Sequence, residues 1–539
     1  MKKALCILFA LVILAVSVAC SRNGQDSDED GDNEYNGETT ATLPNPETQF
    51  PTVPHPSEPL LADAVKVIVD EPVTVINQFL PGGNTSATQW TQTMILDRLV
   101  ENLGNGEYGP MLATSWHTTD CKTYVFELRE GVTFHNSDLF TAEDVVFTVN
   151  AALNAGGTLG YERWRTVESV RALGPYQVEI NLFSTNIDFL FDISSPAAGI
   201  LSERAYSEMG GEIWTQIGTG PFRIAEFEPD DFVRLERFDG FWGQPAQTRE
   251  VTLQYVPEAE ERARLMLSGG YDVCFSVGSV NVAQFESSPD FQIVEMIFNA
   301  PNCIGFNMED PLMANRNFRS AITYAIDRQE VVDSMEGVRA VAQLNGNTWG
   351  YATEFGLDDT PSLRFDPELA RQYLEVSPWS GETIEIAVYG RANMLAAENV
   401  REQLKRNLDM EVTIVELDAA SFFVYVRTAD EAQMHIFPAS FTLSAAESVQ
   451  NVYYPGVANN RTRYSREYVT LLIDEICRTV DLDSRIALFH ELQWFVMDDP
   501  PYLALFWSID PVVAASGVEG MQLGHDAMKC SFRGIYRVL

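Results

Sequence analysis

The segment of residues 217–243 constrains the fold more than any other part of this chain. Gly218 and Gly220 flank Thr219 and precede Pro221, a pattern that predicts a tight backbone turn. Apolar and polar residues then alternate in two runs, as in strands with one buried face. The apolar positions are Phe222, Ile224, Phe227, Phe232, Val233 and Leu235. The segment therefore predicts a β-hairpin.

Two other segments have apolar residues at helical spacing and predict core helices. In the first, Thr141 can cap a helix whose opening turn carries Glu143 and Asp144, since carboxylates there complement the helix dipole. In the second, residues 317–332, Asp327 and Arg328 lie off the apolar stripe. The residues expected to be buried are Val145, Val149 and Leu153 in the first helix, and Phe318, Ile322, Ala325 and Ile326 in the second.

Several segments resemble, in order, the signatures of the extracellular solute-binding proteins of the peptide/nickel class, solute-binding protein family 5, which feed ABC importers. Residues 124–150 resemble Y-T-F-x-L-R-x-G-V-x-F-H-D-G-x-x-F-T-A-E-D-V-x-F-S. Residues 217–243 resemble G-T-G-P-Y/F…L-x-R-x-x-x-Y/F-W, and residues 317–332 resemble V-R-x-A-L-x-Y-A-I-D-R-x-x-I-V. Shorter matches lie at 365–374 and 459–475, so the resemblance runs from about residue 64 to the C-terminus.

The resemblance implies an α/β fold of the two-lobed periplasmic-binding-protein-like kind (type II, large variant), with an additional small α+β domain. The chain after residue 60 is too long for one core, which also favours several domains. The chain is expected to cross between the lobes near residues 299–307 and 500–507. The expected boundaries are 61–104, 215–300 and 501–539 for lobe I, 105–214 for the additional domain, and 301–500 for lobe II.

The N-terminus predicts export. Lys2 and Lys3 precede an apolar run long enough for a signal-peptide core and short for a membrane span, so residues 1–19 are expected to be a cleaved signal peptide. Small residues before Cys20 resemble the lipidation site of bacterial lipoproteins, while the same S-V-A also suits an ordinary signal peptidase. Residues 20–60 are acidic and rich in proline, which predicts an extended, disordered tether.

No motif indicates catalysis, a metal site or a cofactor. The chain lacks G-x-S-x-G, H-E-x-x-H and P-loop motifs, and its six histidines lack metal-ligand spacing. His135 is expected to pack or to form a hydrogen bond. Residues 104–109 match G-x-G-x-x-G, but they follow a helix-like segment and run into Pro110, so no dinucleotide is expected. The net charge of -41 argues against nucleic acid as a partner.

Five of the seven cysteines remain once Cys6 of the signal peptide and Cys20 of the anchor are set aside. An odd number leaves at least one thiol unpaired, and buried free thiols are favoured. If one disulfide forms, Cys274 and Cys303 are the expected pair, because both lie in neighbouring apolar, strand-like runs.

The resemblance also bears on the ligand. Peptide-binding members carry G-W-x-x-D in the second lobe, and its Asp pairs with the ammonium group of the peptide. Counted from Met434, Ala439 replaces that Trp and Thr442 replaces that Asp, and Glu447 supplies the charge only if the loop is realigned. An extended peptide, an oligosaccharide and a metal chelate therefore all stay open. The residues expected near the ligand are Asn345, Trp349, Phe441, Thr442, Glu447 and Tyr454.

The resemblance implies a monomeric, exported protein, anchored by lipid to the outer face of the bacterial cytoplasmic membrane. It is expected to capture a peptide or another small polar solute in an interlobe cleft and to deliver it to an ABC permease and its ATPase, without catalysis. A ligand-sensing receptor of the same fold is an alternative. A secreted hydrolase is the alternative from another class, and it predicts turnover of chromogenic substrates.

Overall fold

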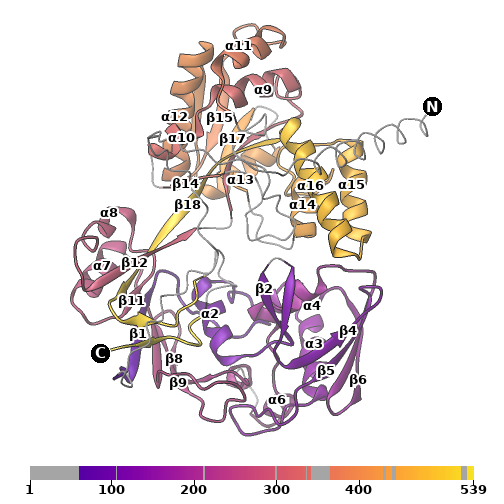
Figure 1. Cartoon of the computed structure of the whole chain (residues 1–539), viewed down its shortest axis with the longest axis vertical. Coiled ribbons are helices and arrows are strands. Elements are labelled where there is room, and N and C mark those ends of the chain that lie inside the picture. The colour runs from indigo at the N-terminus through magenta and orange to yellow at the C-terminus, as the bar shows by residue number, and fades with distance from the viewer. Residues whose placement is uncertain are drawn as a thin grey trace, which may run out of the picture. The chain divides into compact units, whose positions relative to one another are not determined.

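The computed structural model describes residues 60–104, 106–209, 213–297, 300–334, 337–340, 364–428, 433–439, 445–523 and 531–539. Its largest feature is a 12-stranded sheet with the order β16-β15-β17-β13-β18-β11-β1-β10-β9-β8, in which β12 and β14 also pair with β18 (Figure 1). The strands are β1 (Ala64–Val69), β8 (Phe222–Glu228), β9 (Phe232–Arg237), β10 (Glu250–Tyr255), β11 (Val273–Cys274), β12 (Phe291–Ile297), β13 (Asn302–Phe306), β14 (Gly337–Arg339), β15 (Ile384–Val388), β16 (Val412–Glu416), β17 (Met434–Pro438) and β18 (Tyr502–Ala515).

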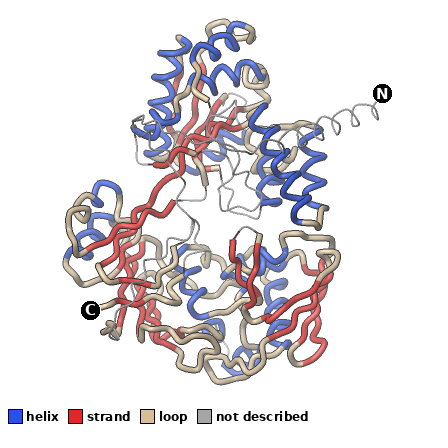
Figure 2. The backbone as a smooth tube through the Cα atoms, viewed as in Figure 1, coloured by secondary structure: helices blue, strands red, loops and turns tan. Residues whose placement is uncertain are grey.

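Strand β18 belongs to both halves of this sheet. Its first half pairs with β13 and β14, and Val338 lies opposite Trp507. Its second half pairs with β11 and β12, and Ile293 lies opposite Val513. Figure 2 shows it as one continuous strand. The segments expected to cross between the lobes contain β13 and the start of β18, and both are extended, as predicted. The mostly apolar sequence of β18 suits a strand covered on both faces.

The half of the sheet that contains β1 and β8–β12 has one core. Strands β1 and β10 are parallel, while β8, β9 and β10 are antiparallel. Residues from both ends of the described chain meet there, since Val67 and Phe532 belong to the same buried cluster. The other elements of this part are α2 (Ser86–Ile95), α7 (Ala259–Leu267), α8 (Ser279–Val282), β19 (Val518–Glu519) and β20 (Tyr536–Arg537).

A separate antiparallel sheet, in the order β4-β5-β7-β6, has a core of its own. Phe126 from the sheet, Val149 from α3 and Trp164 from α4 are buried in this core. The elements are β2 (Val100–Gly104), β3 (Glu107–Pro110), β4 (Ala113–His117), β5 (Thr123–Leu128), α3 (Ala142–Asn154), α4 (Leu159–Trp164), β6 (Val167–Gly174), β7 (Gln177–Leu182), α5 (Phe189–Ile193), η1 (Pro196–Ala198), α6 (Glu203–Met209) and η2 (Ile213–Gln216).

Helices cover both faces of the half of the sheet that contains β13–β17. Residues facing opposite sides of β17, such as Ile436 and Phe437, belong to different buried clusters. Helices α9–α12 contribute to the cluster of Ile436, and α13–α16 to that of Phe437. The bounds are α9 (Arg316–Ala325), α10 (Arg328–Asp333), α11 (Pro367–Glu375), α12 (Arg391–Leu408), α13 (Ala419–Thr428), α14 (Ala445–Tyr453), α15 (Glu467–Arg478) and α16 (Leu482–Asp498).

The predicted hairpin and the helix capped by Thr141 are confirmed. Strands β8 and β9 pair antiparallel, and the backbone N–H of Thr141 donates to the Asp144 carboxylate at 2.8 Å in a capping box. The helical spacing over 317–332 corresponds to two helices, since α9 ends at Ala325 and Asp327 accepts hydrogen bonds from the first turn of α10. The helix-like segment expected before residue 104 is confirmed only as far as Ile95, where α2 ends, since β2 begins at Val100 and forms a hairpin with β3.

Gly218 and Gly220 allow their loop to lie close to the backbone at the end of α2. This corrects their predicted role in a tight turn. Neither has a positive φ. A Cβ on Gly218 would lie 1.9 Å from the carbonyl oxygen of Ile95, and one on Gly220 would lie 2.4 Å from that of Met94. His135 fixes this loop, because its Nδ1 accepts from the Gly218 N–H at 3.2 Å and its Nε2 lies 3.1 Å from the Gly220 carbonyl oxygen. The expected hydrogen-bonding role of His135 is therefore confirmed.

The expected disulfide between Cys274 and Cys303 is wrong, since both are buried free thiols. Cys274 lies opposite Val513 of β18, whereas Cys303 lies opposite Ala504. At about 3.3 Å per residue these positions on β18 are roughly 30 Å apart. The two strands are neighbours of β18 in different halves of the sheet, and a disulfide needs Cα atoms within about 7 Å.

Candidate functional site

The structure describes two of the six residues expected near the ligand. Glu447 lies in the first turn of α14, and Tyr454 directly follows that helix. The Tyr454 hydroxyl donates to the Asp474 carboxylate at 3.2 Å, and this hydrogen bond raises the pKa of Tyr454. The expected residues outside the described parts of the chain are Asn345, Trp349, Phe441 and Thr442, together with the predicted lipidation site Cys20.

Glu447 contacts a distant part of the chain. It forms an ion pair of 3.1 Å with Arg165, which directly follows α4. The side chains of Arg165 and Glu447 are 45% and 30% exposed, so water screens the pair, which stabilises by about 1 kcal/mol or less. The pair is therefore a weak link between α4 and α14.

A buried carboxyl group lies beside this ion pair. Asp192, in α5, accepts a hydrogen bond from Asn186 at 3.3 Å and lies 3.7 Å from Arg163. Burial raises the pKa of Asp192 to about 8; Arg163 opposes that rise, whereas Glu447 adds to it. The charge of Asp192, which is close enough for Glu447 to act on it, therefore changes at a pH of about 8.

An arginine and four aromatic side chains meet where β15 and β17 end. The Arg461 guanidinium carbon lies 4.7 Å from the ring centroid of Phe423 and 4.6 Å from that of Phe437. Tyr389, directly after β15, lies with its ring centroid 4.8 Å from that of Phe422 and 5.4 Å from that of Phe423. Ligands of open α/β sheets bind outside the carboxyl ends of strands. These five residues, the Arg461 cluster, are therefore a candidate ligand surface.

His435 lies next to the Arg461 cluster and is neutral. Its ring centroid is 5.1 Å from that of Phe437, and the side chain is fully buried. Among the residues that the structure describes, neither ring nitrogen has a hydrogen-bond partner. Burial lowers the pKa of His435 to about 3, and the positive charge of Arg461 adds to the effect. The positive charge of the cluster therefore resides on Arg461.

We expect His435→Leu to reduce the acid sensitivity of the fold. The unfolded wild-type chain binds a proton at His435 below a pH of about 6.5, whereas the folded chain binds it only near pH 3. Between these two values, each unit by which the pH falls therefore lowers the free energy of unfolding by about 1.4 kcal/mol. Urea unfolding measures the free energy of unfolding at pH 7 and at pH 5. Its decrease between the two should be about 2 kcal/mol larger in the wild type than in the variant. Equal losses would show that folding does not lower the pKa of His435.

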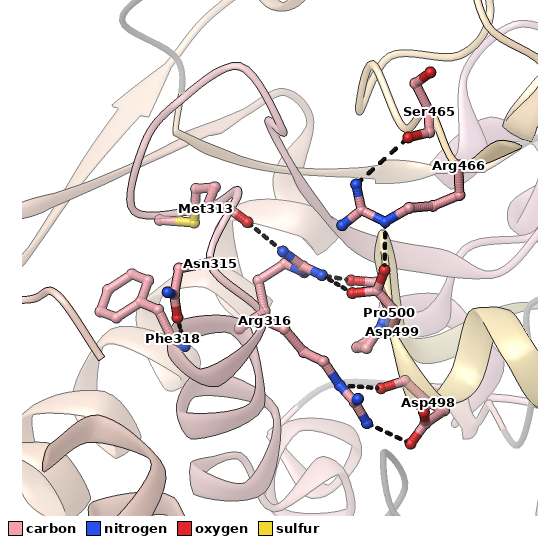
Figure 3. A network of polar contacts seen from close by, with 10 residues as sticks. Met313, Asn315, Arg316, Phe318, Ser465, Arg466, Asp498, Asp499 and Pro500 are labelled. Carbon is pink, nitrogen blue, oxygen red and sulfur yellow. Dashed lines mark hydrogen bonds and ion pairs between the residues drawn. The ribbon is translucent and has the colours of Figure 1, made fainter. Parts of the chain in front are cut away.

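A buried arginine anchors the turn that precedes β18. Arg319 donates to the carbonyl oxygens of Pro500 and Met313 at 3.0 and 2.6 Å and to the Asp499 carboxylate. Arg466 donates to the other oxygen of Asp499 at 2.8 Å (Figure 3). These contacts join α9 to the start of the strand that both halves of the sheet share. The apolar pattern of 317–332 gave no signal for this role, because Arg319 is a charged residue inside a core helix.

Two kinds of feature are missing from the described residues. No group of three or more His, Cys, Asp or Glu side chains there could hold a metal ion. No helix there has the length and apolar content to span a bilayer.

Sequence comparison identifies a family. The family model "Bacterial extracellular solute-binding proteins, family 5 Middle" matches residues 107–460. The dipeptide-binding protein of Escherichia coli is 27% identical over 329 residues, which cover 55% of this chain and 60% of that protein. The nickel-binding periplasmic protein of Escherichia coli is 26% identical over 353 residues, which cover 62% of this chain and 63% of that protein. The aligned regions thus span less than two thirds of both relatives.

Structural comparison confirms the predicted fold class. The structure of HbpA2 from Haemophilus parasuis covers 88% of this chain and 100% of its own, with a TM-score of 0.77 and 21% sequence identity. The fold is thus the two-lobed α/β fold of periplasmic binding proteins, as predicted. Because the family match also covers more than half of the sequence, the chain belongs to the bacterial extracellular solute-binding proteins of family 5.

Proposed function

We propose that the protein is the substrate-binding component of an ABC importer, which captures a peptide or another small polar solute and delivers it to the permease. The family match over residues 107–460 carries this proposal. Two similar proteins are named for binding dipeptides and nickel, which supports a small solute as the ligand. In this proposal the protein binds and releases its solute unchanged.

The proposed mechanism is closure of two lobes, in which the solute favours the closed state by binding it more tightly. The pairing of β18 supports a hinge, because its partner changes from β14 at Ser508 to β12 at Ile509. The other connection runs between β12 and β13. In this proposal lobe I comprises residues 61–104, 215–300 and 501–539, the additional domain 105–214, and lobe II 301–500.

We place the solute between the lobes, where Glu447 and Arg165 meet. A ligand ammonium group that binds Glu447 has to replace Arg165, and the weakness of that exposed ion pair makes the exchange inexpensive. The side chains proposed to contact the solute are Asn345, Trp349, Phe441, Thr442, Glu447 and Tyr454.

We also propose that the protein works as a monomer outside the cytoplasmic membrane. The apolar run and the small residues before Cys20 support a signal peptide over residues 1–19 and a lipid anchor on Cys20. The acidic, proline-rich residues 20–60 support a tether between that anchor and the binding domains.

A thermal-shift screen tests the function. We expect one class among mixed di- and tripeptides, oligosaccharides and nickel chelates to raise the midpoint of unfolding. A solute at 100 times its Kd should add about 2.7 kcal/mol to the free energy of unfolding. An unrelated protein of similar thermal midpoint is the control. No shift with any class, together with turnover of chromogenic esters, glycosides or peptides, would contradict a binding role and favour a hydrolase.

A further inference from the structure

The guanidinium of Arg461 differs from those of other buried arginines nearby. Arg319 pairs with Asp499, and Arg328 donates to the carbonyl oxygens of Ala340 and Ala504 at 2.6 and 3.3 Å. Arg461 is partly buried, and its side chain makes no hydrogen bond or ion pair with any residue that the structure describes. Within the described part of the chain, no hydrogen bond or ion pair thus occupies its side-chain N–H donors.

No acidic group among the described residues pairs with the guanidinium of Arg461. Burial lowers its pKa, and the groups whose charges also act on it are Tyr502, Tyr389 and the cationic Arg427. No carboxylate is among them. Two residues along the chain, Arg463 pairs with Glu309 at 2.9 Å and with the Asn307 side chain at 2.8 Å. Among the described residues, Arg461 thus lacks the acidic partner that Arg463 has, in a chain with a net charge of -41.

The two phenylalanines of the cluster hold the guanidinium without using its donors. Phe423 and Phe437 lie within 4.7 Å of its carbon, a distance at which a cation interacts with an aromatic ring. The face of an aromatic ring accepts no conventional hydrogen bond, so these contacts leave the planar fork of N–H donors for another group. That fork matches the two oxygens of a carboxylate.

The position of the cluster suits a ligand. Val388 at the end of β15 lies opposite Ile436, and Pro438 at the end of β17 lies opposite Asn302. Asn302 in turn lies opposite Phe506, beyond which β18 continues to its pairing with β12. The carboxyl ends of β15 and β17 therefore face the side of this sheet from which β18 leaves toward the other half.

We propose that Arg461 binds a carboxylate of the captured solute, with Phe423 and Phe437 holding its guanidinium in place. This inference rests on the proposed function and narrows it to solutes that carry a carboxylate. The carboxylate belongs either to the C-terminus of a peptide or to an organic acid or chelator.

Paired probes that differ only in the carboxylate test this inference. The full chain is titrated calorimetrically with a mixed di- and tripeptide library, with the same library as C-terminal amides, with citrate, and with citrate trimethyl ester. We expect the wild type to bind one acid form about tenfold to a hundredfold more tightly than its neutral counterpart, the range of a charge-assisted hydrogen-bonded pair. A preference within the peptide pair identifies a peptide C-terminus, and one within the citrate pair identifies an organic acid.

Arg461→Gln should abolish the preference, and Arg461→Lys, which keeps the charge but loses the fork, should retain part of it. The ratio of two affinities on one protein is insensitive to a partly unfolded sample. Arg406→Gln is the matched control, because it removes the same charge from an exposed arginine already paired with Glu330 at 2.7 Å, and it should keep the full preference.

Three results would overturn the inference. Equal binding of acid and neutral forms by the wild type, or an undiminished preference in Arg461→Gln, would overturn it and leave the proposed function standing. Binding of none of the four probes by the wild type would overturn it as well; the thermal-shift screen with oligosaccharides and nickel chelates then decides the proposed function separately.

Discussion

Asp499→Asn is expected to lower the free energy of unfolding by about 3–5 kcal/mol, the cost of removing one partner of a buried ion pair. Arg319 is fully buried, and Asp499 is the carboxylate that neutralises it. After the change, the guanidinium keeps its bonds to the carbonyl oxygens of Pro500 and Met313 but loses its counter-charge. Burial already lowers the pKa of Arg319, and Asp499 offsets that effect. Urea unfolding followed by circular dichroism measures the loss.

The preceding residue provides a matched control. Asp498 pairs with Arg316 at 2.6 Å, but their side chains are 59% and 53% exposed, so Asp498→Asn should change the stability by no more than about 1 kcal/mol. The two variants remove the same charge from neighbouring positions at the end of α16. Equal effects would show that Arg319 is hydrated or neutralised by another group.

Gly218→Ala is expected to cost about 3 kcal/mol or more, the upper end of the range for overpacked sites. The added methyl group would lie 1.9 Å from the carbonyl oxygen of Ile95, and a backbone atom cannot rotate away as a side chain can. The loop would have to leave His135, whose ring binds the backbone at Gly218 and Gly220. The expected observation is a large fall in the midpoint of thermal unfolding, or failure of the hairpin region to fold.

Gly156→Ala is the control for this change. Gly156 lies in the turn after α3, has no positive φ, and leaves open space where a Cβ would stand. The same methyl group should therefore change the stability there by no more than about 0.5 kcal/mol. If Gly218→Ala were as mild as Gly156→Ala, the close approach of this loop to α2 would be wrong.

The sequence predicted those elements whose local signals agree with their tertiary environment. The alternation after Pro221 and the cap at Thr141 gave the correct hairpin and helix, because propensity, patterning and capping point the same way there. The break at Asp327 was missed, since apolar periodicity continues across it while the side chain of Asp327 starts a new helix. Local patterns cannot show which backbone lies against a glycine, so Gly218 was assigned to a turn.

The candidate site was harder to predict for a physical reason. Arg461 lies in a polar segment without periodicity, and the described residues around it show rings in place of an acidic partner only in three dimensions. Its ring neighbours Phe423 and Phe437 come from α13 and β17, so no spacing in the sequence unites them. A family resemblance pointed instead to Thr442 and Glu447, of which Glu447 pairs with Arg165.

Native mass spectrometry of the full chain, purified without denaturation, tests the central claim most directly. We predict a complex heavier than the protein alone, and we expect unfolding to release one class of small solute from it. The mass of that solute should stay the same when it is incubated with the protein for a long time. Protein that stays free of ligand after incubation with peptides, oligosaccharides and nickel chelates, or that converts any of them, would contradict the proposal of a solute-binding component of an importer.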